Sequence, residues 1–375
     1  MKKIEWRKIC YWSLISIPVL ILLNLLLKIK MFSGLVELFY SRIIYRFVSS
    51  VLSTLTSLLP FSIIEIIILI SPFFITCILV FLIKNSITQL IKLKKGIKES
   101  SKTFFNILAV ICALTSVGFA LYTSGLSLNY NRRPISRTLA LDTSEPSKEE
   151  LAAAFEYIIK NANQSCVELD WTSYDEILYN GNIGGQTNAT LKKMGQTDPL
   201  YKGGRVIPKP LLTSNYLSRT SITAFFSPYT YETNYIASYP LFSIPQTLCH
   251  ESAHLRGFAR EDESEYIGFI ACTQSNDKLF RFSGYMYAYN LFGNALYKTD
   301  KKSYEVLSET ADRRIHSQWK SYSEFTEQHK DSSLNKTTEK VNDIYIKSQG
   351  VSDGVQSYDR SLLLIIGQFR RDGVI

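Results

Sequence analysis

The sequence predicts a mainly helical α+β protein that is anchored in a membrane by its N-terminal part. Three observations support this. Nearly all long apolar runs lie before residue 124. Residues 1–102 carry 14 Lys and Arg against 4 Asp and Glu, whereas the rest of the chain carries 28 against 29. The later part combines apolar positions at helical spacing with one stretch of strand-like alternation. We therefore expect a membrane region, 1–123, and an extracytoplasmic domain, 124–375.

Three apolar segments are long enough to span a bilayer, at about 10–27, 62–83 and 103–123. The first has a longer apolar core than a secretory signal and no small-residue cleavage site, so we interpret it as an uncleaved anchor. The segment 84–102 carries six lysines and one acidic residue. Because cationic flanks stay in the cytoplasm, this segment and the basic N-terminus are expected inside, and 124–375 outside.

Residues 34–59 predict an amphipathic helix. Apolar side chains recur at helical spacing on one face, and Glu37, Arg42, Arg46 and several serines take the other. We expect this helix to lie on the outer leaflet or to pack under the domain. A fourth span is the alternative; it would reverse the topology and place three charges in hydrocarbon, which is costly.

The first half of the domain contains both helix and turn signals. Ser147 and Glu150 form a capping box before a helix at 148–163. The stretch 171–206 is rich in Asn-Gly, Gly-Gly and Asp-Pro pairs, which predict loops. Within it, Gly203 and the glycine after it suggest a short hairpin.

The second half of the domain begins with strands and continues with helices. Residues 220–236 alternate polar with aromatic or β-branched side chains, as strands do. Ser243 predicts the N-cap of a helix that ends at Gly257, and a second helix follows at 261–274. Later helices are expected at 280–298, 303–329, 336–348 and 357–371.

The stretch CHESAHLRGFAREDESEY carries the chemistry. His250 and His254 are four positions apart on the predicted helix, so both imidazoles point to one side, with Glu251 about 100° round the helix. Zinc-dependent hydrolysis needs two neutral nitrogen ligands and a carboxylate that takes a proton from the attacking water. The sequence therefore predicts Zn²⁺ at His250 and His254, with Glu251 as general base. The alternative is a solvated helix face with two surface histidines.

A catalytic zinc site needs a third protein ligand. The remaining histidines, His316 and His329, lie in a polar stretch and are expected at the surface. We favour Glu261 as the third ligand, with Glu263 as the alternative. Glu265 shares a helix face with Glu261 and is expected to accept a hydrogen bond from an imidazole N–H.

Substrate contacts are less sharply marked. Tyr285 and Tyr358 are candidate donors to the developing oxyanion, and packing in the core is the alternative for each. The extended segment 225–236 is a candidate edge strand for an extended peptide, with Glu232 and Asn234 as possible contacts or as surface polarity.

The HExxH stretch resembles the site of the gluzincins, in which a glutamate on a second helix follows the motif. Here Glu261-Asp-Glu-Ser-Glu265 takes that place, and Glu265 departs from the usual Asp or Asn. Almost the whole chain also resembles a bacterial family of three-span membrane proteins, domain of unknown function family 3810. The stretches that carry this resemblance are LNYNRRP (128–134), ITAFFSPYTYETN (222–234), PQTLCHESAHLRGFAREDESEY (245–266), RFSGYMYAYNLFGNALY (281–297) and VNDIYIKSQGVSDGVQSYDRSLLLIIGQFR (341–370). The resemblance implies the fold, the topology and a metallopeptidase site, without a known substrate.

Together these features predict a membrane-anchored zinc metallopeptidase of gluzincin type that hydrolyses a peptide or protein at the outer face of the cell membrane. A cell-wall peptide amide also fits, and membrane lipid is an expected partner. The near-neutral domain has no basic stripe, which argues against nucleic acid. The alternatives are a membrane sensor or receptor and a non-catalytic scaffold with a zinc-binding domain. Cys166, Cys249 and Cys272 are expected as buried free thiols, with a single bridge from Cys249 to either of the others as the alternative.

Overall fold

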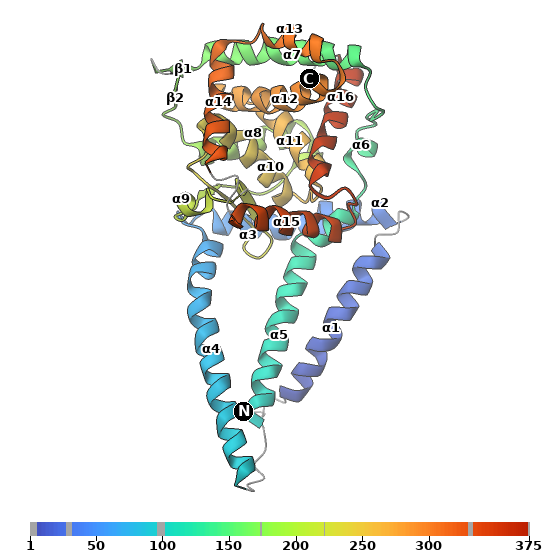
Figure 1. The fold of residues 1–375 in the computed structure, drawn as a ribbon. Coiled ribbons are helices and arrows are strands. Elements are labelled where there is room, and N and C mark those ends of the chain that lie inside the picture. Colours follow the sequence, from blue (N-terminus) through green and yellow to red (C-terminus); the bar gives the residue numbers. More distant parts are fainter. Residues whose placement is uncertain are drawn as a thin grey trace.

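The computed structural model describes residues 6–27, 32–95, 102–172, 175–220, 222–328 and 333–373. The protein has a mainly helical domain, and the long helices of the N-terminal part extend from one side of it (Figure 1). The helices of the N-terminal part are α1 (Trp6–Leu27), α2 (Ser33–Leu35), η2 (Val36–Tyr45), α3 (Arg46–Thr56), α4 (Ile63–Lys94) and α5 (Lys102–Gly125).

Two helical segments in the described residues are long and apolar enough to cross a membrane. One is Ile63–Lys92 in α4, and the other is Ala109–Asn131, which continues from α5 into the short turn η3 (Ser127–Asn131). Helix α1 covers the first predicted span. Three crossings and the direction of insertion stay predictions.

The predicted amphipathic helix is present as the continuous stretch Ser33–Thr56, which we call the base helix; it lies along the base of the domain (Figure 1). Its buried side chains are mostly small or polar and pack toward the domain: Val36, Glu37, Ser41, Tyr45, Ser49 and Ser53. Its exposed side chains include the large apolar residues Phe39, Ile43, Phe47, Val51 and Leu55. The helix therefore packs under the domain, as expected, and leaves its apolar face uncovered on the side from which α4 and α5 depart.

The domain is mainly helical and contains a two-stranded and a three-stranded sheet. Its helices are α6 (Ile135–Thr138), α7 (Lys148–Glu168), α8 (Ile183–Thr197), η4 (Pro199–Tyr201), α9 (Ser214–Leu217), η5 (Leu241–Ser243), α10 (Ile244–Leu255), α11 (Glu261–Thr273), α12 (Lys278–Thr299), α13 (Lys301–Ser308), α14 (Arg313–Glu327), α15 (Ser333–Ser348), η6 (Gly354–Arg360) and α16 (Ser361–Asp372). Its strands are β1 (Asp170–Trp171), β2 (Ile177–Leu178), β3 (Lys209–Pro210), β4 (Ala224–Ser227) and β5 (Glu232–Tyr235).

The strand prediction for 220–236 is confirmed by β4 and β5. They pair antiparallel, with Phe226 opposite Thr233, and β3 adds in parallel on the other side of β5. The order β3-β5-β4 leaves β4 at the edge of this sheet. The position of β4 matters below, because its free edge faces the candidate site.

Two loop predictions are wrong. Within 171–206, residues Ile183–Thr197 form α8, because the Asn182 side chain accepts the Gly185 N–H at 2.8 Å and caps a helix instead of forming a turn. The structure has no hairpin at Gly203. The following Gly204 lies against the base helix, where a Cβ would come within 2.5 Å of the Ser50 Cα.

Some helices begin at a cap made by a neighbouring residue, and others begin at a contact with a distant part of the chain. The capping box at Ser147 and Glu150 is confirmed. Ser243 does not cap α10; the Gln246 N–H donates instead to Ser283 Oγ of α12 at 3.0 Å. The predicted helix 303–329 is interrupted, because the Asp312 side chain accepts the Arg314 N–H and starts α14.

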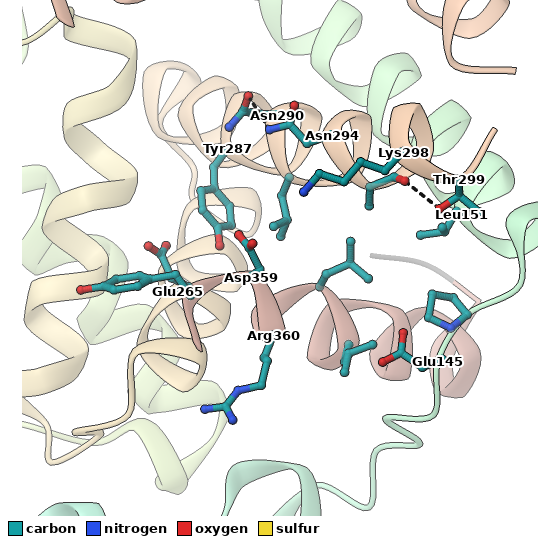
Figure 2. A pocket seen from close by; sticks show the side chains of 16 residues that line it. Glu145, Leu151, Glu265, Tyr287, Asn290, Asn294, Lys298, Thr299, Asp359 and Arg360 are labelled. Atoms are coloured by element: carbon teal, nitrogen blue, oxygen red, sulfur yellow. Dashed lines mark hydrogen bonds between the residues drawn. The ribbon is translucent and has the colours of Figure 1, made fainter. Parts of the chain in front are cut away.

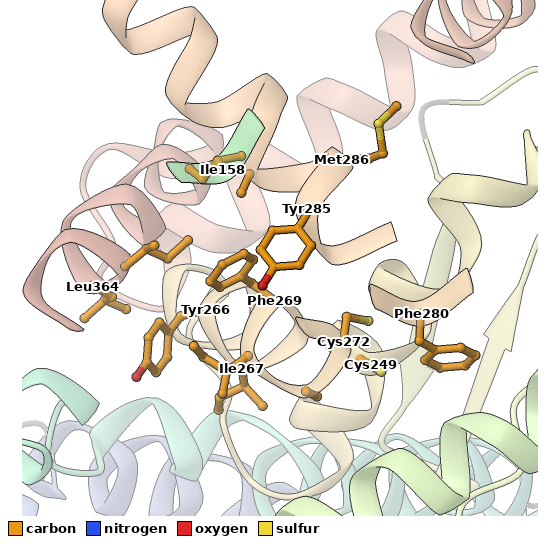
Figure 3. Packing of buried hydrophobic residues seen from close by; sticks show 14 of the residues in the cluster. Ile158, Cys249, Tyr266, Ile267, Phe269, Cys272, Phe280, Tyr285, Met286 and Leu364 are labelled. Carbon is orange, nitrogen blue, oxygen red and sulfur yellow. The ribbon is translucent and has the colours of Figure 1, made fainter. Parts of the chain in front are cut away.

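The hydrophobic core lies where α10, α11 and α12 pack together with α7 and α16 (Figure 3). Phe269 and Phe280 are among its fully buried side chains. Cys166, Cys249 and Cys272 are buried and free, as expected. The core therefore holds α10 and α11, which carry the predicted metal ligands, in fixed relation to each other.

Candidate metal centre

The candidate centre is built from the consecutive helices α10 and α11. Gly257 ends the first helix with a φ of +86°, a backbone conformation that glycine adopts without strain, and the chain turns back. On α11, a Cβ at Gly268 would lie 3.1 Å from the Gln246 carbonyl oxygen and 3.1 Å from the backbone nitrogen of His250. The two glycines thus let the helices reverse and approach closely, which brings the start of α11 beside the histidines.

Three predicted ligands converge on one point. The Nε2 atoms of His250 and His254 are 3.1 Å apart, and Glu261 Oε2 lies 3.3 Å from each of them. All three side chains are buried. Ligand atoms at 2.0–2.1 Å from a tetrahedral ion lie about 3.3–3.4 Å from one another. The observed spacing therefore fits a zinc ion held by three protein ligands, and Glu261 Oε2 makes no hydrogen bond that would compete.

A backbone contact fixes the orientation of the His254 ring. Its Nδ1 lies 2.8 Å from the Phe258 carbonyl oxygen, and the Ser264 hydroxyl donates to the same carbonyl at 2.8 Å. A carbonyl only accepts, so Nδ1 carries the proton in this contact and Nε2 is left free for a metal.

The His250 ring has a carboxylate behind it. Its Nδ1 is 3.5 Å from Glu265 Oε1 without forming the hydrogen bond that the sequence led us to expect, and Gln246 Nε2 donates to the other oxygen of that carboxylate. Burial alone lowers the pKa of His250, but Glu265 and Glu261 raise it well above its usual value. Glu265 therefore favours a proton on Nδ1 and leaves Nε2 facing the centre.

The ionisable groups of the centre shift one another's pKa. Burial lowers the pKa of His254, yet Glu261 raises it above the usual value. Burial raises the pKa of Glu261, and the two imidazoles overcome this and hold it well below its usual value. The Glu261 carboxylate is thus ionised although it is buried.

Glu251 lies beside the three ligands, as the motif predicts. Its carboxylate is buried and lines the same cavity as Phe226, where α10 packs against β4. Burial raises its pKa, although the neighbouring imidazoles act in the opposite direction. The carboxylate therefore lies between the predicted metal ligands and the edge strand.

Other predicted residues are placed elsewhere. Glu263, the alternative ligand, turns away, and its Oε1 accepts the Ile135 N–H at 2.8 Å. Tyr285 packs in the core against Phe269 (Figure 3), so the structure gives it no place at the centre. His316 is exposed, and His329 lies outside the described residues.

Glu232 and Asn234 are buried and do not line the cavity at the centre, so they are not the substrate contacts that the sequence suggested. The Glu232 carboxylate accepts the N–H groups of Ile63 and Ile64 at the start of α4 and pairs with Lys209. It therefore joins the sheet to the first turn of a candidate membrane helix.

Tyr358 is the predicted tyrosine that reaches the site. Its ring stacks on His250 with an interplanar angle of 12°, and it lines a cavity of about 400 Å³ together with His250, Glu251, His254 and Glu261. Burial raises the pKa of Tyr358 well above its usual value, so the hydroxyl keeps its proton and can donate.

A second cavity of about 540 Å³ adjoins the first, with Glu265 and Tyr358 lining both. It lies between α12 and α16 and is lined by polar and charged side chains such as Asn290, Lys298 and Asp359 (Figure 2). The two cavities give a ligand room on both sides of Tyr358.

Several lining residues have no local signal in the sequence. Tyr130 follows α5, and Asn342 and Tyr345 belong to α15, far from the motif along the chain. They fall within the stretches 128–134 and 341–370 that carry the family resemblance. Membership of these stretches was the one sequence feature that could have pointed to the three residues, because separate stretches of the family resemblance meet at one cavity.

The turn between α10 and α11 is tied to the base helix. The buried Arg132 guanidinium donates to the Gly257 carbonyl at 2.8 Å and pairs with Glu37 of the base helix. Tyr45, also of the base helix, donates its hydroxyl proton to the His254 carbonyl at 3.2 Å. The base helix thus contacts the backbone of a predicted metal ligand directly.

Comparisons with known proteins give one match. No curated protein and no solved structure matches the chain. One family model matches residues 40–366, from the base helix to α16, and this range contains every residue of the candidate centre. The chain therefore belongs to the family described as "Protein of unknown function (DUF3810)".

Proposed function

We propose that this protein is a membrane-anchored zinc-dependent metallopeptidase of gluzincin type that hydrolyses peptide bonds at the outer face of the membrane. One observation carries the proposal. The donor atoms of His250, His254 and Glu261 have the mutual spacing of tetrahedral zinc ligands, and they lie beside the carboxylate of Glu251 in an open cavity. Three protein ligands leave one coordination position for chemistry.

The proposed chemistry uses side chains on each side of the centre. When bound, zinc supplies Lewis-acid polarisation of the substrate carbonyl and of the attacking water. Glu251 takes the proton from that water; its raised pKa brings it closer to neutral pH, where a general base works best. The Tyr358 hydroxyl donates to the oxygen on which negative charge develops.

Substrate binding is assigned to the edge of β4. Residues Ile222–Phe226 line the cavity in succession, and β4 has no strand on its outer side among the described residues. An extended peptide that pairs with this edge gains main-chain hydrogen bonds and passes the centre with its carbonyl groups aligned. This arrangement favours a peptide over a small ester or amide.

Metal analysis combined with the Glu251→Gln variant tests the proposal. The purified protein is expected to bind one zinc per chain and to cleave peptides. Glu251→Gln keeps the zinc and loses about 10²–10⁴-fold in turnover, whereas His254→Ala loses both zinc and turnover. A protein that binds zinc without cleaving any member of a peptide library is a sensor or a scaffold, and the proposal is then wrong.

A further inference from the structure

The position of the cleft relative to the membrane limits what can enter it. We infer that the substrate is a membrane-tethered polypeptide, which is cut within a few residues of the bilayer surface. This inference rests on the proposed peptidase function and adds the class of substrate.

The contacts of the β4–β5 hairpin show how far the candidate centre lies from the ends of the candidate membrane helices. At its turn, a Cβ on Gly125, the last residue of α5, would lie 2.6 Å from the Pro228 carbonyl oxygen. At its other strand, Glu232 accepts the N–H groups of Ile63 and Ile64 at the start of α4. The hairpin therefore contacts the domain-facing ends of α4 and α5.

The same hairpin reaches the catalytic carboxylate. Glu251 lines the same cavity as Phe226, where α10 packs against β4, and Phe226 is two residues from Pro228. A strand rises about 3.3 Å per residue, so these two contacts are about 7 Å apart along β4. The general base thus lies about two residue lengths along β4 from the contact with the end of α5.

Two further contacts place the candidate centre close to the bilayer surface. The cavity is lined by Leu126 and Tyr130, which belong to the apolar segment Ala109–Asn131. On the side of the centre that faces α4 and α5, Tyr45 of the base helix contacts the His254 carbonyl. The apolar side chains of Phe39, Ile43 and Phe47 on the same helix point away from the domain. An amphipathic helix with such a face lies at the headgroup boundary, which places the centre directly above it.

The direction of the edge strand then selects the substrate. A peptide that pairs with β4 extends, at one end, toward the turn at Pro228 and hence toward the bilayer. A polypeptide held in the membrane presents its first extended residues there. A soluble chain has to bring a free end or a loop down to the same level and gains nothing from the location.

Reconstitution with tethered peptides tests the inference. The zinc-loaded full-length protein is placed in liposomes with mixed-sequence peptides that carry a lipid anchor, and with the same peptides without an anchor. A spacer before the mixed sequence is lengthened stepwise to about 20 residues, ~65 Å when extended. Cleavage positions are read by mass spectrometry. Because every anchored peptide is concentrated at the vesicle surface, the cut position relative to the anchor is the deciding measurement.

The expected result is that cuts gather within about six residues of the anchor, ~20 Å of extended chain, that they move into the spacer as it lengthens, and that Glu251→Gln abolishes them. Cuts spread evenly along the peptides, or equal cleavage of free peptides, would overturn the tethered substrate while leaving the peptidase standing. No cleavage of any peptide by the zinc-loaded protein would overturn both.

A depth measurement tests the height independently of activity. Tyr229, in the hairpin turn, is 48% exposed, and Val167, on α7 at the opposite end of the domain (Figure 1), is 68% exposed. Tyr229→Trp is expected to be quenched by brominated lipids more strongly than Val167→Trp, each relative to the unaltered protein. Equal quenching would place the hairpin away from the bilayer and overturn the inference.

Discussion

The carboxylates of Glu261 and Glu263 lie two positions apart on α11 and have opposite surroundings. Glu261 Oε2 faces two imidazole nitrogens at 3.3 Å, whereas Glu263 Oε1 accepts the Ile135 N–H at 2.8 Å on another side of the helix. Both side chains are buried. One helix turn therefore holds a carboxylate suited to a cation and a carboxylate with a structural hydrogen bond.

The two glutamates provide a matched pair for zinc affinity. Loss of a residue that only hydrogen-bonds to a metal ligand weakens metal binding by about 10–100-fold. Glu261→Gln is expected to weaken zinc binding by more than this, because a direct ligand is lost. Glu263→Gln is expected to leave the affinity almost unchanged. Competition with a chromogenic chelator measures both values. Loss of zinc in Glu263→Gln alone would make Glu263 the ligand.

Glu263 also predicts a pH dependence of stability. Burial raises its pKa from 4.5 to about 7. Between these values the folded state holds a proton that the unfolded state has released, so this stabilisation is present at low pH and is lost as the pH rises toward 7. The difference amounts to about 3 kcal/mol.

Glu263→Gln isolates this contribution, because the amide stays neutral at every pH and can still accept the Ile135 N–H. In the zinc-free protein, the variant is expected to gain stability relative to the natural chain as the pH is raised from about 5 to 8. Thermal unfolding in detergent across that range provides the comparison. A constant difference between the two proteins would show that the carboxyl is ionised throughout.

The ion pairs of Glu37 predict how firmly the base helix is held. Arg132 and Arg42 both pair with this carboxylate, and their side chains are 3% and 32% exposed. Arg132→Ala leaves a buried carboxylate without its main partner and is expected to cost about 3–5 kcal/mol. Arg42→Ala removes a screened pair and is expected to cost about 1 kcal/mol or less. Equal losses in unfolding free energy would contradict this assignment.

Two tyrosines that look equivalent in the sequence are expected to differ in activity. Tyr358 lines the cavity and stacks on His250, while Tyr285 packs in the core. Tyr358→Phe is expected to lower kcat by about 10²–10³-fold with little change in KM, because it removes a donor to the developing oxyanion. Tyr285→Phe is the control and should retain its kcat. A change confined to KM in Tyr358→Phe would assign the hydroxyl to substrate binding.

The cluster of His250, His254 and Glu261 could be predicted because its geometry is local. His250, Glu251 and His254 share one helix turn, and Gly257 with its positive φ returns the chain to Glu261 a few residues later. Helical periodicity and a glycine turn are enough to bring these groups together. The capping box at Ser147 was predictable for the same reason.

Contacts between distant segments could not be predicted in this way. Ser283 replaces Ser243 as the partner of the first turn of α10, because α12 packs there. The sequence likewise gives no sign that Tyr358, rather than Tyr285, stands against His250. Such choices depend on how helices far apart in the chain pack, which a local pattern does not encode.

The most direct test of the metal centre is a crystal structure with anomalous data collected on both sides of the zinc absorption edge. The proposed function predicts one zinc peak at about 2.0–2.2 Å from His250 Nε2, His254 Nε2 and a carboxylate oxygen of Glu261, with the fourth position held by solvent. A peak elsewhere, or a fourth protein ligand that closes the site, would contradict the metallopeptidase.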